Sequence, residues 1–151
     1  MKAASIAASL PAWIQDHLQR YLDTDGADGY LWDARLGGGQ GMVPTLLLTT
    51  IGRKSQRALT LPLIFGRAGT SYMVVASKGG APEHPAWYLN LQQQPEVQVQ
   101  VKADRFTAHA RTVQGAERAV LWAQMLQLYA PYETYQTKTT RQIPLVMIDP
   151  V

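Results

Sequence analysis

Runs of apolar residues, some alternating with polar ones and some continuous, dominate the chain from residue 45 onward and predict a β-rich core. Val97–Val101 alternates strictly with glutamine, which indicates a strand with one buried and one wet face, typical of an antiparallel sheet. Short turn segments at 66–69 and 103–104 favour hairpins. Pro62 cannot donate to a strand ladder, so it places its strand at an edge or a bulge. Six strands are predicted, enough for a barrel: Thr45–Thr50, Leu59–Phe65, Tyr72–Ser77, Val97–Val101, Phe106–Arg111 and Leu145–Ile148.

Two segments have the period of amphipathic helices. The first, residues 10–22, has Ser9 as its N-cap and Pro11 in its first turn, and its apolar stripe is made of Ile14, Leu18, Tyr21 and Leu22. We expect this N-terminal helix, within residues 1–22, to pack on the sheet with His17 facing solvent. A lid or a membrane-surface helix is the alternative, which is weakened because the polar face is not strongly basic.

The second helix, residues 114–130, has the strongest helical pattern in the chain, with an apolar stripe of Ala119, Trp122, Met125, Leu126 and Tyr129. Tyr132 and Tyr135 follow after Pro131, so tyrosines recur every three residues. Such a row is commonly packing with its hydroxyl groups at the surface. It also suits the lining of a pocket for an aromatic ligand.

Residues 23–43 are rich in aspartate and glycine and have no sustained period, so they predict a loop. A loop of this length in a small domain is usually either disordered or folded over a site. Tyr30, Leu31 and Trp32 give it apolar anchors that a disordered segment would lack. We therefore expect a partly ordered, flap-like loop, followed by a barrel with helices at residues 44–151.

The composition narrows the class of protein. The chain has 151 residues, which fits one domain with a core of its own, residues 1–151. It has no cysteine and three scattered histidines, so we expect no disulfide, no metal site and a cytoplasmic location. A net charge of +3 without a basic run predicts no nucleic-acid partner. No segment is suited to a membrane-spanning helix or a signal sequence.

The stretch from residue 74 to residue 101 reads as a strand, a glycine- and proline-rich loop, a short helix and a second strand. Lys78 lies where the first strand ends. Gly79 and Gly80 follow without side chains, so their backbone N–H groups can approach a flat or anionic ligand closely. On this segment alone, a plain connector with Trp87 as a core anchor is the preferred interpretation.

A basic cluster lies earlier in the chain, at Arg53, Lys54 and Arg57, with Lys78 a strand away. Such a cluster suits a small phosphate or carboxylate ligand. The chain has no Walker loop, no GxGxxG, no GxSxG and no paired carboxylates at helical spacing. A self-contained hydrolase is therefore not expected.

Five short segments together resemble one known family. They are TTIGRKS at 49–55, ASKGGAP at 76–82, HPAWYLNL at 84–91, PEV at 95–97 and IPLV at 143–146. Their order and spacing are similar to those of the deazaflavin-dependent nitroreductases, a branch of the flavin/deazaflavin oxidoreductases. The flap-like loop also looks like the segment that precedes the barrel in that family. The resemblance implies a mainly β fold with flanking helices (α+β), the split β-barrel of FMN-binding-like proteins.

The resemblance also implies a cofactor, coenzyme F420, which is a 5-deazaflavin with a phosphate and an oligoglutamate tail. The cations and hydroxyl of the turn at 52–55 suit that phosphate and those glutamates. One departure is Gln56, where glycine is usual, and it indicates a differently shaped turn. The residues that the resemblance assigns to the cofactor are Arg53, Lys54, Ser55, Arg57, Pro62, Leu63, Ala76, Ser77, Lys78, Gly79, Ala86, Trp87, Tyr88 and Asn90.

The same resemblance places Tyr129, Tyr132 and Tyr135 on the substrate side of the cofactor. A phenol there can stack on a planar acceptor and donate a hydrogen bond to its carbonyl or nitro oxygen. We predict Tyr132 as the proton donor or orienting group, with the Ser77 hydroxyl as the second candidate. The implied activity is hydride transfer from the reduced deazaflavin to planar electron-poor acceptors such as quinones, activated enones or nitroaromatics.

Two alternatives stay open at this point. One is an FMN-dependent oxidoreductase of the same fold, against which the basic turn argues because FMN has one phosphate and no glutamate tail. The other is a non-catalytic barrel that binds a cofactor or an apolar ligand without turnover. Either a monomer or a homodimer fits the sequence, and the N-terminal helix is a candidate for peripheral contact with a membrane.

Overall fold

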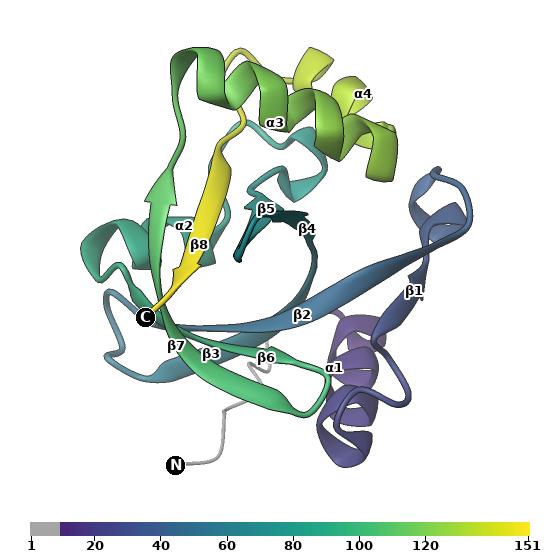
Figure 1. Cartoon of the computed structure of the whole chain (residues 1–151), viewed down its shortest axis with the longest axis vertical. Coiled ribbons are helices and arrows are strands. Elements are labelled where there is room, and N and C mark those ends of the chain that lie inside the picture. Colours follow the sequence, from purple (N-terminus) through teal and green to yellow (C-terminus); the bar gives the residue numbers. More distant parts are fainter. Residues whose placement is uncertain (1–9) are drawn as a thin grey trace.

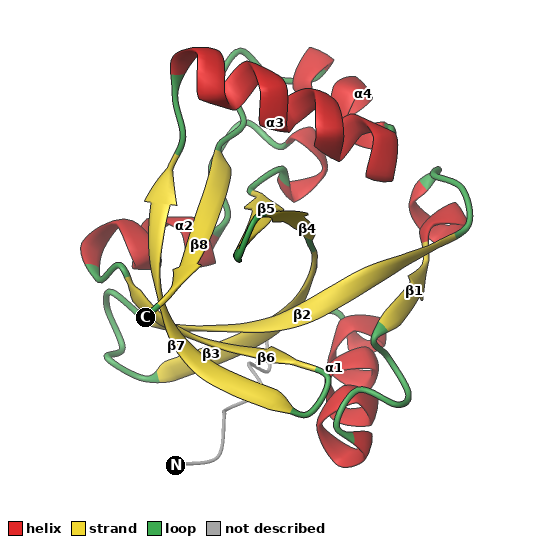
Figure 2. Cartoon of the chain, in the orientation of Figure 1, coloured by secondary structure: helices red, strands yellow, loops and turns green. Residues whose placement is uncertain are grey.

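A curled antiparallel sheet with helices around it forms the protein, as seen in the computed structural model, which describes residues 10–151 (Figure 1). The helices are α1 (Ala12–Thr24), α2 (Ala86–Gln93), α3 (Gly115–Leu128) and α4 (Pro131–Thr137), with short 3₁₀ turns η1 (Ala34–Gly37) and η2 (Lys78–Gly80). The strands are β1 (Leu31–Asp33), β2 (Met42–Ile51), β3 (Ala58–Ile64), β4 (Gly66–Ala68), β5 (Ser71–Val75), β6 (Glu96–Val101), β7 (Asp104–Thr112) and β8 (Leu145–Pro150). Figure 2 shows α3 and α4 together at the top of the view and α1 at the lower right.

β2 pairs with more strands than any other strand of the sheet, namely β1, β3 and β6. The strands follow the order β1-β2-β6-β7-β8-β5-β4, and β3 pairs with β2 outside this path. All of these pairings are antiparallel. β2 pairs with β3 along Thr45–Ile51 and with β6 along 47–49, so part of it is hydrogen bonded on both edges. The sheet curls into a half-barrel, which agrees with the mainly β, split-barrel fold that the resemblance implied (Figure 1).

Buried side chains form two main clusters on the two faces of this sheet. Leu46 and Leu48 of β2 pack with Val97 and Val99 of β6 in the first cluster, as the alternating pattern of β6 requires. The second cluster joins β5 and β8 to α3 and α4, and it includes Val75, Met125, Tyr129, Tyr132 and Leu145. The helices that carry the tyrosines are therefore fixed to the sheet by the core itself.

The prediction for Pro62 is confirmed, because β3 pairs only with β2 within the described residues and is an edge strand. Pro62 lies opposite Leu47 in this pairing. At the free edge of β3 no neighbouring strand needs a backbone N–H from residue 62. A proline there therefore costs the sheet no hydrogen bond at that edge.

The prediction of a partly ordered, flap-like loop at residues 23–43 missed a strand. Leu31–Asp33 forms the short strand β1, which pairs with β2 from Leu31 opposite Pro44 to Asp33 opposite Met42. The turn η1 follows, capped by the Asp33 carboxylate, which accepts a hydrogen bond from the Arg35 backbone N–H at 3.0 Å. The apolar anchors predicted from the sequence thus lie on an added strand.

The strand count is also corrected, from six to the eight strands of the sheet. β1 is one of the two additions, and β4 is the other. Residues 66–69 were expected to be a hairpin turn, but Gly66–Ala68 forms β4 and pairs with β5. The expected hairpin at 103–104 is present, with Lys102 at a φ of 55° between β6 and β7.

Helix α1 packs on the sheet as predicted, but the expectation that His17 faces solvent is wrong. His17 is buried with Leu18 and Tyr21, and its Nε2 lies 2.7 Å from the Gly29 carbonyl oxygen. Gly29 has a φ of 114° and lies against the His17 ring, so the absence of a side chain there permits the contact. The proposed N-cap Ser9 lies outside the described residues, and the helix begins after Pro11.

The stripe predicted for the second helix is partly corrected. Leu121 and Met125 are the buried residues of α3, whereas Ala119 is exposed. The helix ends at Leu128, because Tyr129 leaves the helical conformation with a φ of −146°, and α4 starts at Pro131. The tyrosines therefore do not share one helical face; they meet because the chain bends between α3 and α4.

The described residues contain no group of three or more histidine, aspartate or glutamate side chains that could hold a metal ion. None of the helices in this part of the chain combines the length and the apolar composition needed to cross a bilayer.

Tyr21→Phe tests how α1 is held. The Tyr21 hydroxyl donates to the Thr45 carbonyl at 2.9 Å and accepts from the Lys102 backbone N–H at 2.9 Å. Loss of both buried hydrogen bonds should lower the free energy of unfolding by about 1–3 kcal/mol, measured by denaturant titration. Tyr72→Phe is the control, because the Tyr72 hydroxyl has no hydrogen-bond partner among the described residues. An equal loss in both variants would contradict the role given to Tyr21.

The same hydroxyl predicts a dependence on pH. Burial raises the pKa of Tyr21 to about 12, above the value of about 10 expected in the unfolded chain. Its contribution to stability is therefore complete below about pH 10 and is lost as the pH rises towards 12. In Tyr21→Phe, the free energy of unfolding should therefore fall less between about pH 10 and pH 12 than in the wild type, as measured by denaturant titration at each pH.

Candidate active site

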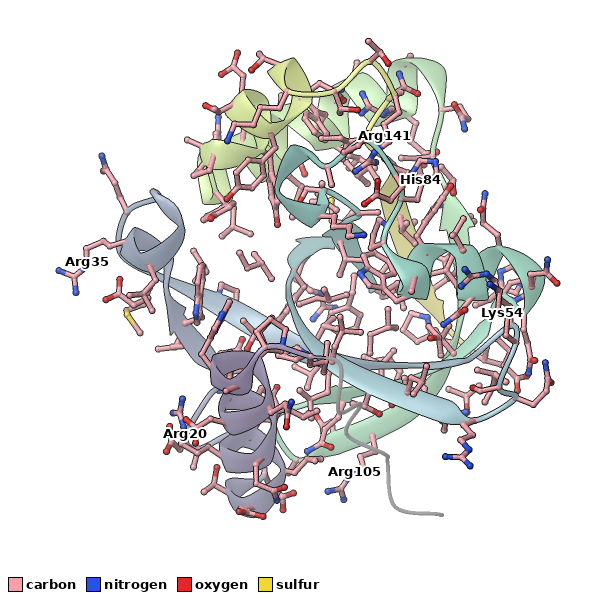
Figure 3. The ribbon with its side chains drawn as sticks, turned by 180° about the vertical axis from the view of Figure 1, so that it is seen from behind. Arg20, Arg35, Lys54, His84, Arg105 and Arg141 are labelled. Atoms are coloured by element: carbon pink, nitrogen blue, oxygen red, sulfur yellow. The ribbon has the colours of Figure 1, made fainter. Side chains whose placement is uncertain are left out.

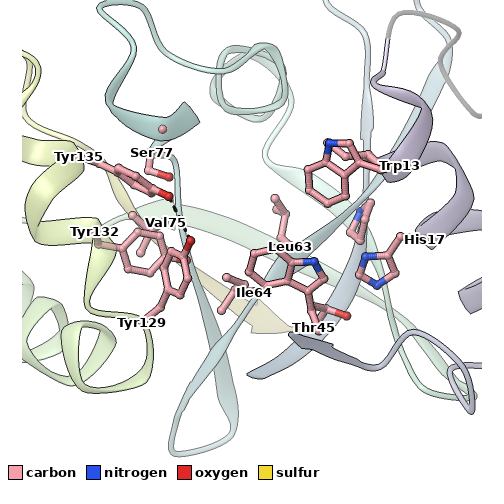
Figure 4. Close-up of a pocket in the computed structure, with 14 residues that line it drawn as sticks. Trp13, His17, Thr45, Leu63, Ile64, Val75, Ser77, Tyr129, Tyr132 and Tyr135 are labelled. Carbon is pink, nitrogen blue, oxygen red and sulfur yellow. Dashed lines mark hydrogen bonds between the residues drawn. The ribbon is translucent and has the colours of Figure 1, made fainter. Parts of the chain in front are cut away.

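A cavity of about 220 Å³ lies between the N-terminal and C-terminal parts of the chain (Figure 4). α1 and β1 contribute Trp13, Ile14, His17 and Trp32. The sheet contributes Thr45, Pro62, Leu63, Ile64 and Val75. The remaining lining residues are Ser77, Gly79, Tyr129, Tyr132 and Tyr135. The walls are mostly apolar and aromatic, which suits a flat organic ligand.

Aromatic rings form a continuous surface along this cavity. Trp13 and Trp32 are stacked, with ring centroids 6.3 Å apart and an interplanar angle of 23°. Trp32 approaches Tyr129 at 6.1 Å, and Tyr129 meets the Tyr132 ring edge to face at 4.9 Å. Rings at these separations favour stacking on a further planar group.

Two of the tyrosines hold η1 in place through their hydroxyl groups. The Tyr129 hydroxyl donates to the Gly37 carbonyl oxygen at 3.0 Å and lies 3.0 Å from the Tyr135 hydroxyl. The Tyr135 hydroxyl is 3.4 Å from the same carbonyl. A side chain at Gly37 would collide with the Tyr129 hydroxyl, so glycine is needed for this close approach. Both phenol protons are used within this triangle, whichever hydroxyl donates to the carbonyl.

Tyr132 differs from its two neighbours. It is buried at 4% exposure, and its hydroxyl has no hydrogen-bond partner among the described residues. Burial, together with Tyr129 and Tyr135, raises the pKa of Tyr132 well above its usual range. At neutral pH its phenol is therefore protonated, and this proton is not used by another residue of the described chain.

The loop after β5 brings Ser77 and the backbone of Gly79 to the cavity. Ser77 is in the right-handed helical region, and Lys78, Gly79 and Gly80 follow with φ values of 45°, 63° and 84°. A right-handed residue followed by a left-handed one directs successive N–H groups into a concave, anion-binding arrangement. A side chain at Gly80 would collide with the Tyr135 carbonyl, whereas one at Gly79 would meet nothing within 4 Å. The loop is thus packed against α4 on one side and open on the other.

The basic turn joins β2 to β3 at the other end of β3. Buried Asn90 of α2 organises it, because its Oδ1 accepts from the Arg53 backbone N–H at 3.1 Å and from the Arg53 guanidinium at 3.0 Å. Lys54, Ser55 and Arg57 are exposed, and Figure 3 shows Lys54 at the margin of the molecule. The turn therefore has one anchored cation and further cations that are free to reach a ligand.

Gln56 has a φ of 59°, which explains why glycine is common at such a position. The Gln56 backbone N–H donates to the Gly52 carbonyl at 2.8 Å, and the Ser55 hydroxyl accepts from the Arg57 backbone N–H at 3.2 Å. Gln56 thus adopts the left-handed conformation that glycine adopts most easily. The local hydrogen bonds of the turn offset the strain of placing a side chain there.

Comparison with known proteins assigns this arrangement to a family. A family model described as F420H(2)-dependent quinone reductase matches residues 13–150. The chain belongs to this family. An F420H(2)-dependent quinone reductase of Mycobacterium tuberculosis is 40% identical over 111 residues, which cover 72% of this chain and 74% of the relative. The resemblance noted in the sequence is confirmed.

Solved structures of similar chains confirm the split β-barrel. One, an F420-H2 dependent reductase named FDR-A, has a TM-score of 0.65 at 40% identity and covers 70% of this chain and 94% of its own. Another, described as a domain-swapped dimer, has a TM-score of 0.68 at 35% identity and covers 91% of this chain and 97% of its own. The fold and the aromatic cavity thus occur in a chain of the quinone reductase family.

The predicted site residues fall into separate groups in this quinone reductase homologue. Those at the cavity are Pro62, Leu63, Ser77, Gly79, Tyr129, Tyr132 and Tyr135. Arg53, Lys54, Ser55 and Arg57 lie together in the basic turn with Asn90 behind them. Ala76 is buried next to Ser77, and Lys78 is exposed and forms an ion pair with Glu83 at 2.9 Å. Their roles towards the cofactor stay predictions.

The third predicted group, Ala86, Trp87 and Tyr88, does not line the cavity. Trp87 and Tyr88 are buried in the first core cluster, and Ala86 is exposed. The Tyr88 hydroxyl lies 2.7 Å from the Thr112 hydroxyl of β7. These contacts make α2 a support for the sheet, which agrees with the interpretation of Trp87 as a core anchor that its segment favoured on its own.

Several cavity residues were not predicted as site residues from the sequence. Trp13 and Ile14 lie on α1, and Thr45, Ile64 and Val75 lie on strands. Trp32 was expected only as an anchor of the flap-like loop. A signal was present in the loop, since binding residues lie disproportionately on loops and this glycine-rich segment carries two aromatic residues, Tyr30 and Trp32. The strand residues carry no such signal, because their apolar type is the same as in the core.

Proposed function

We propose that the protein transfers hydride from reduced coenzyme F420 to quinones and to similar planar, electron-poor acceptors. The observation that carries the proposal is the position of the two candidate ligand-binding features at the two ends of β3. The basic turn precedes Ala58, and the aromatic cavity begins at Pro62. A long ligand with an anionic tail and a flat ring matches this pair of features, in a chain of the quinone reductase family.

The dimensions of β3 fit such a ligand. At about 3.3 Å per residue, the strand separates Arg57 from Leu63 by roughly 20 Å. Arg53, Lys54 and Arg57 would hold the phosphate and glutamates at one end, and the backbone of Ser77 and Gly79 would lie along the ring at the other. The space beside Gly79 is unobstructed. The described residues therefore fit the cofactor, and a direct contact with Trp87 or Tyr88 is the least supported part of the assignment.

When bound, reduced deazaflavin supplies the hydride, and the protein supplies position and polarisation. Tyr129 and Tyr135 close the cavity through Gly37 and present their rings to a planar acceptor. The Tyr132 phenol donates a hydrogen bond to the acceptor oxygen, because its proton is not used elsewhere in the described chain. Stabilising the negative charge that develops on this oxygen is the chemical role of Tyr132. The Ser77 hydroxyl is the second donor available at the cavity.

Lys54→Ala tests the position of the cofactor tail. Lys54 is exposed and makes no contact that holds the fold, so its loss should weaken binding of oxidised coenzyme F420 by about 1–3 kcal/mol without changing stability. A fluorescence titration measures the affinity, beside a titration with FMN, which should bind far more weakly. Arg67→Ala, on the β4 hairpin, is the control and should leave the affinity unchanged. Unchanged affinity in the Lys54 variant would place the tail elsewhere.

Tyr132→Phe tests the proton donor. The ring is retained, so the affinity for the cofactor should stay within experimental error while kcat for a quinone falls roughly tenfold or more. Tyr72→Phe, outside the cavity, should keep full turnover. An unchanged kcat on several acceptors would remove Tyr132 from the mechanism, and no turnover in the wild type with bound cofactor would favour the non-catalytic barrel.

The assembly and the membrane contact are proposed together. Exposed apolar side chains, Trp13, Leu31, Leu36 and Met42, lie on α1, β1, η1 and β2 next to the cavity. We propose that these side chains contact a membrane that carries lipid quinone. We also propose that the protein is a homodimer, like the relative described as a domain-swapped dimer. Co-sedimentation with phosphatidylglycerol vesicles should fall in a Trp13→Ser, Leu36→Ser variant. Equal recovery of the protein with and without vesicles would contradict the membrane contact. A monomer in sedimentation equilibrium would contradict the homodimer.

A further inference from the structure

Arg141 lies in the segment between α4 and β8 and binds the loop after β5, and Figure 3 shows it close to His84 of that loop. Its Nε donates to the Ala81 carbonyl at 2.9 Å, its Nη1 to the Ala76 carbonyl at 3.2 Å and its Nη2 to the Ser77 carbonyl at 2.9 Å. Nη1 also lies 3.1 Å from His84 Nδ1. Every nitrogen of the guanidinium group is thus directed at the segment from residue 76 to residue 84.

The backbone of Arg141 is fixed to α4 as firmly as its side chain is fixed to the loop. Gln136 of α4 donates from Nε2 to the Arg141 carbonyl at 2.7 Å. The Oε1 atom of Gln136 accepts from the Ile143 backbone N–H at 2.8 Å. Arg141 therefore links the helix that carries Tyr132 to the loop that carries Ser77, which are two different walls of the cavity.

The loop needs such a link because its conformation is unfavourable for an L residue. Lys78 adopts a φ of 45°, in the left-handed region, between Ser77 and two glycines. The Ser77 carbonyl accepts from the Gly80 N–H at 2.9 Å as well as from Arg141. A planar group with several donors can hold three carbonyl oxygens at once, which a lysine cannot do.

We propose that Arg141 is a positioning residue, which sets Ser77 and Gly79 against the cofactor ring while holding them at a fixed place relative to Tyr132. This inference rests on the proposed function only for its ligand. The link between loop and helix is a property of the chain alone and is testable without cofactor.

His84 completes the arrangement. Arginine can only donate, so Nδ1 of His84 accepts, and the imidazole proton lies on Nε2. Protonation of His84 would remove the acceptor and place two cations next to each other. The other groups that face His84 are the Tyr88 ring at 4.9 Å and Glu83, which pairs with Lys78. Burial, followed by Arg141, keeps the pKa of His84 below its usual range, so the neutral form is present at physiological pH.

The first experiment uses the cofactor-free protein. Hydrogen–deuterium exchange of the peptide that covers residues 76–84 should be faster in Arg141→Ala than in the wild type, with Arg141→Lys between them. Arg118→Ala is the matched control, because Arg118 also donates to the same C-terminal segment, at the Ile143 carbonyl, but does not touch the loop. Unchanged exchange in Arg141→Ala overturns the proposal, as does an equal acceleration in Arg118→Ala.

The second experiment measures affinity for oxidised coenzyme F420 in the same variants. Arg141→Ala should bind about tenfold to a hundredfold more weakly, and Arg118→Ala should bind like the wild type even if its melting temperature falls. Added guanidinium should restore part of the affinity of Arg141→Ala. Full affinity in Arg141→Lys would show that charge alone suffices and would overturn the positioning role. Failure of the wild type to bind would reject the proposed function and leave the exchange result standing.

The pH dependence gives a readout that a general loss of stability would not produce. Because the pKa of His84 is lowered in the folded protein, its contribution is present at and above about pH 6.5 and is lost as the pH falls below that value. Exchange in residues 76–84 should therefore accelerate, beyond the intrinsic effect of pH, in acid. His84→Asn keeps an acceptor at every pH and should abolish this acceleration, whereas His109→Gln, at an exposed position of β7, should retain it. An identical profile in all three proteins contradicts the pairing.

Discussion

Pairing on both edges of β2 is the constraint on which the site depends. Leu47 and Leu48 lie opposite Pro62 and Leu61 of β3 on one side and opposite Gln100 and Val99 of β6 on the other. β6 and β3 occupy opposite edges of β2, and β3 pairs with no further strand of the described chain, so it is the last strand at its edge of the sheet. The free side of β3 then carries both the basic turn at its start and the cavity at its end. A ligand can lie along β3 only because no further strand of the described chain covers it.

The sequence predicted the parts of this fold that follow from local periodicity, and Pro62 limited β3 to an edge or a bulge, of which the structure shows the edge. β1 and β4 were missed, because three-residue strands are too short to show an alternating pattern and form only through pairing with β2 and β5. The burial of His17 was missed for a different reason. Its partner is a carbonyl oxygen twelve residues away, at Gly29, and no residue type announces a backbone acceptor.

In the candidate site, too, some residues could be predicted from local sequence, whereas others depend on long-range contacts. Tyrosines at a fixed spacing, a serine at a strand end and cations in a turn are visible in the sequence, and the structure gathers them at the two ends of β3. Trp13 and Arg141 depend on long-range contacts, with Trp32 for the first and with the carbonyls of Ala76 and Ser77 for the second. A helix residue and a loop residue with such partners look like ordinary surface positions until the chain is folded.

Charge and apolar surface are separated along the site, and the separation assigns different tasks to its two ends. Lys54 and Arg57 are exposed, so their attraction to an anionic tail is long-ranged and is screened by salt. Tyr132 is buried in a cavity of neutral rings, where a single phenol donor is worth more because water does not compete with it. In the proposed function, the basic end therefore selects the cofactor, whereas the aromatic end selects the acceptor by shape and by the placement of one proton. Residues that hold the two walls in register, rather than additional charges at the ring, are what such a site requires.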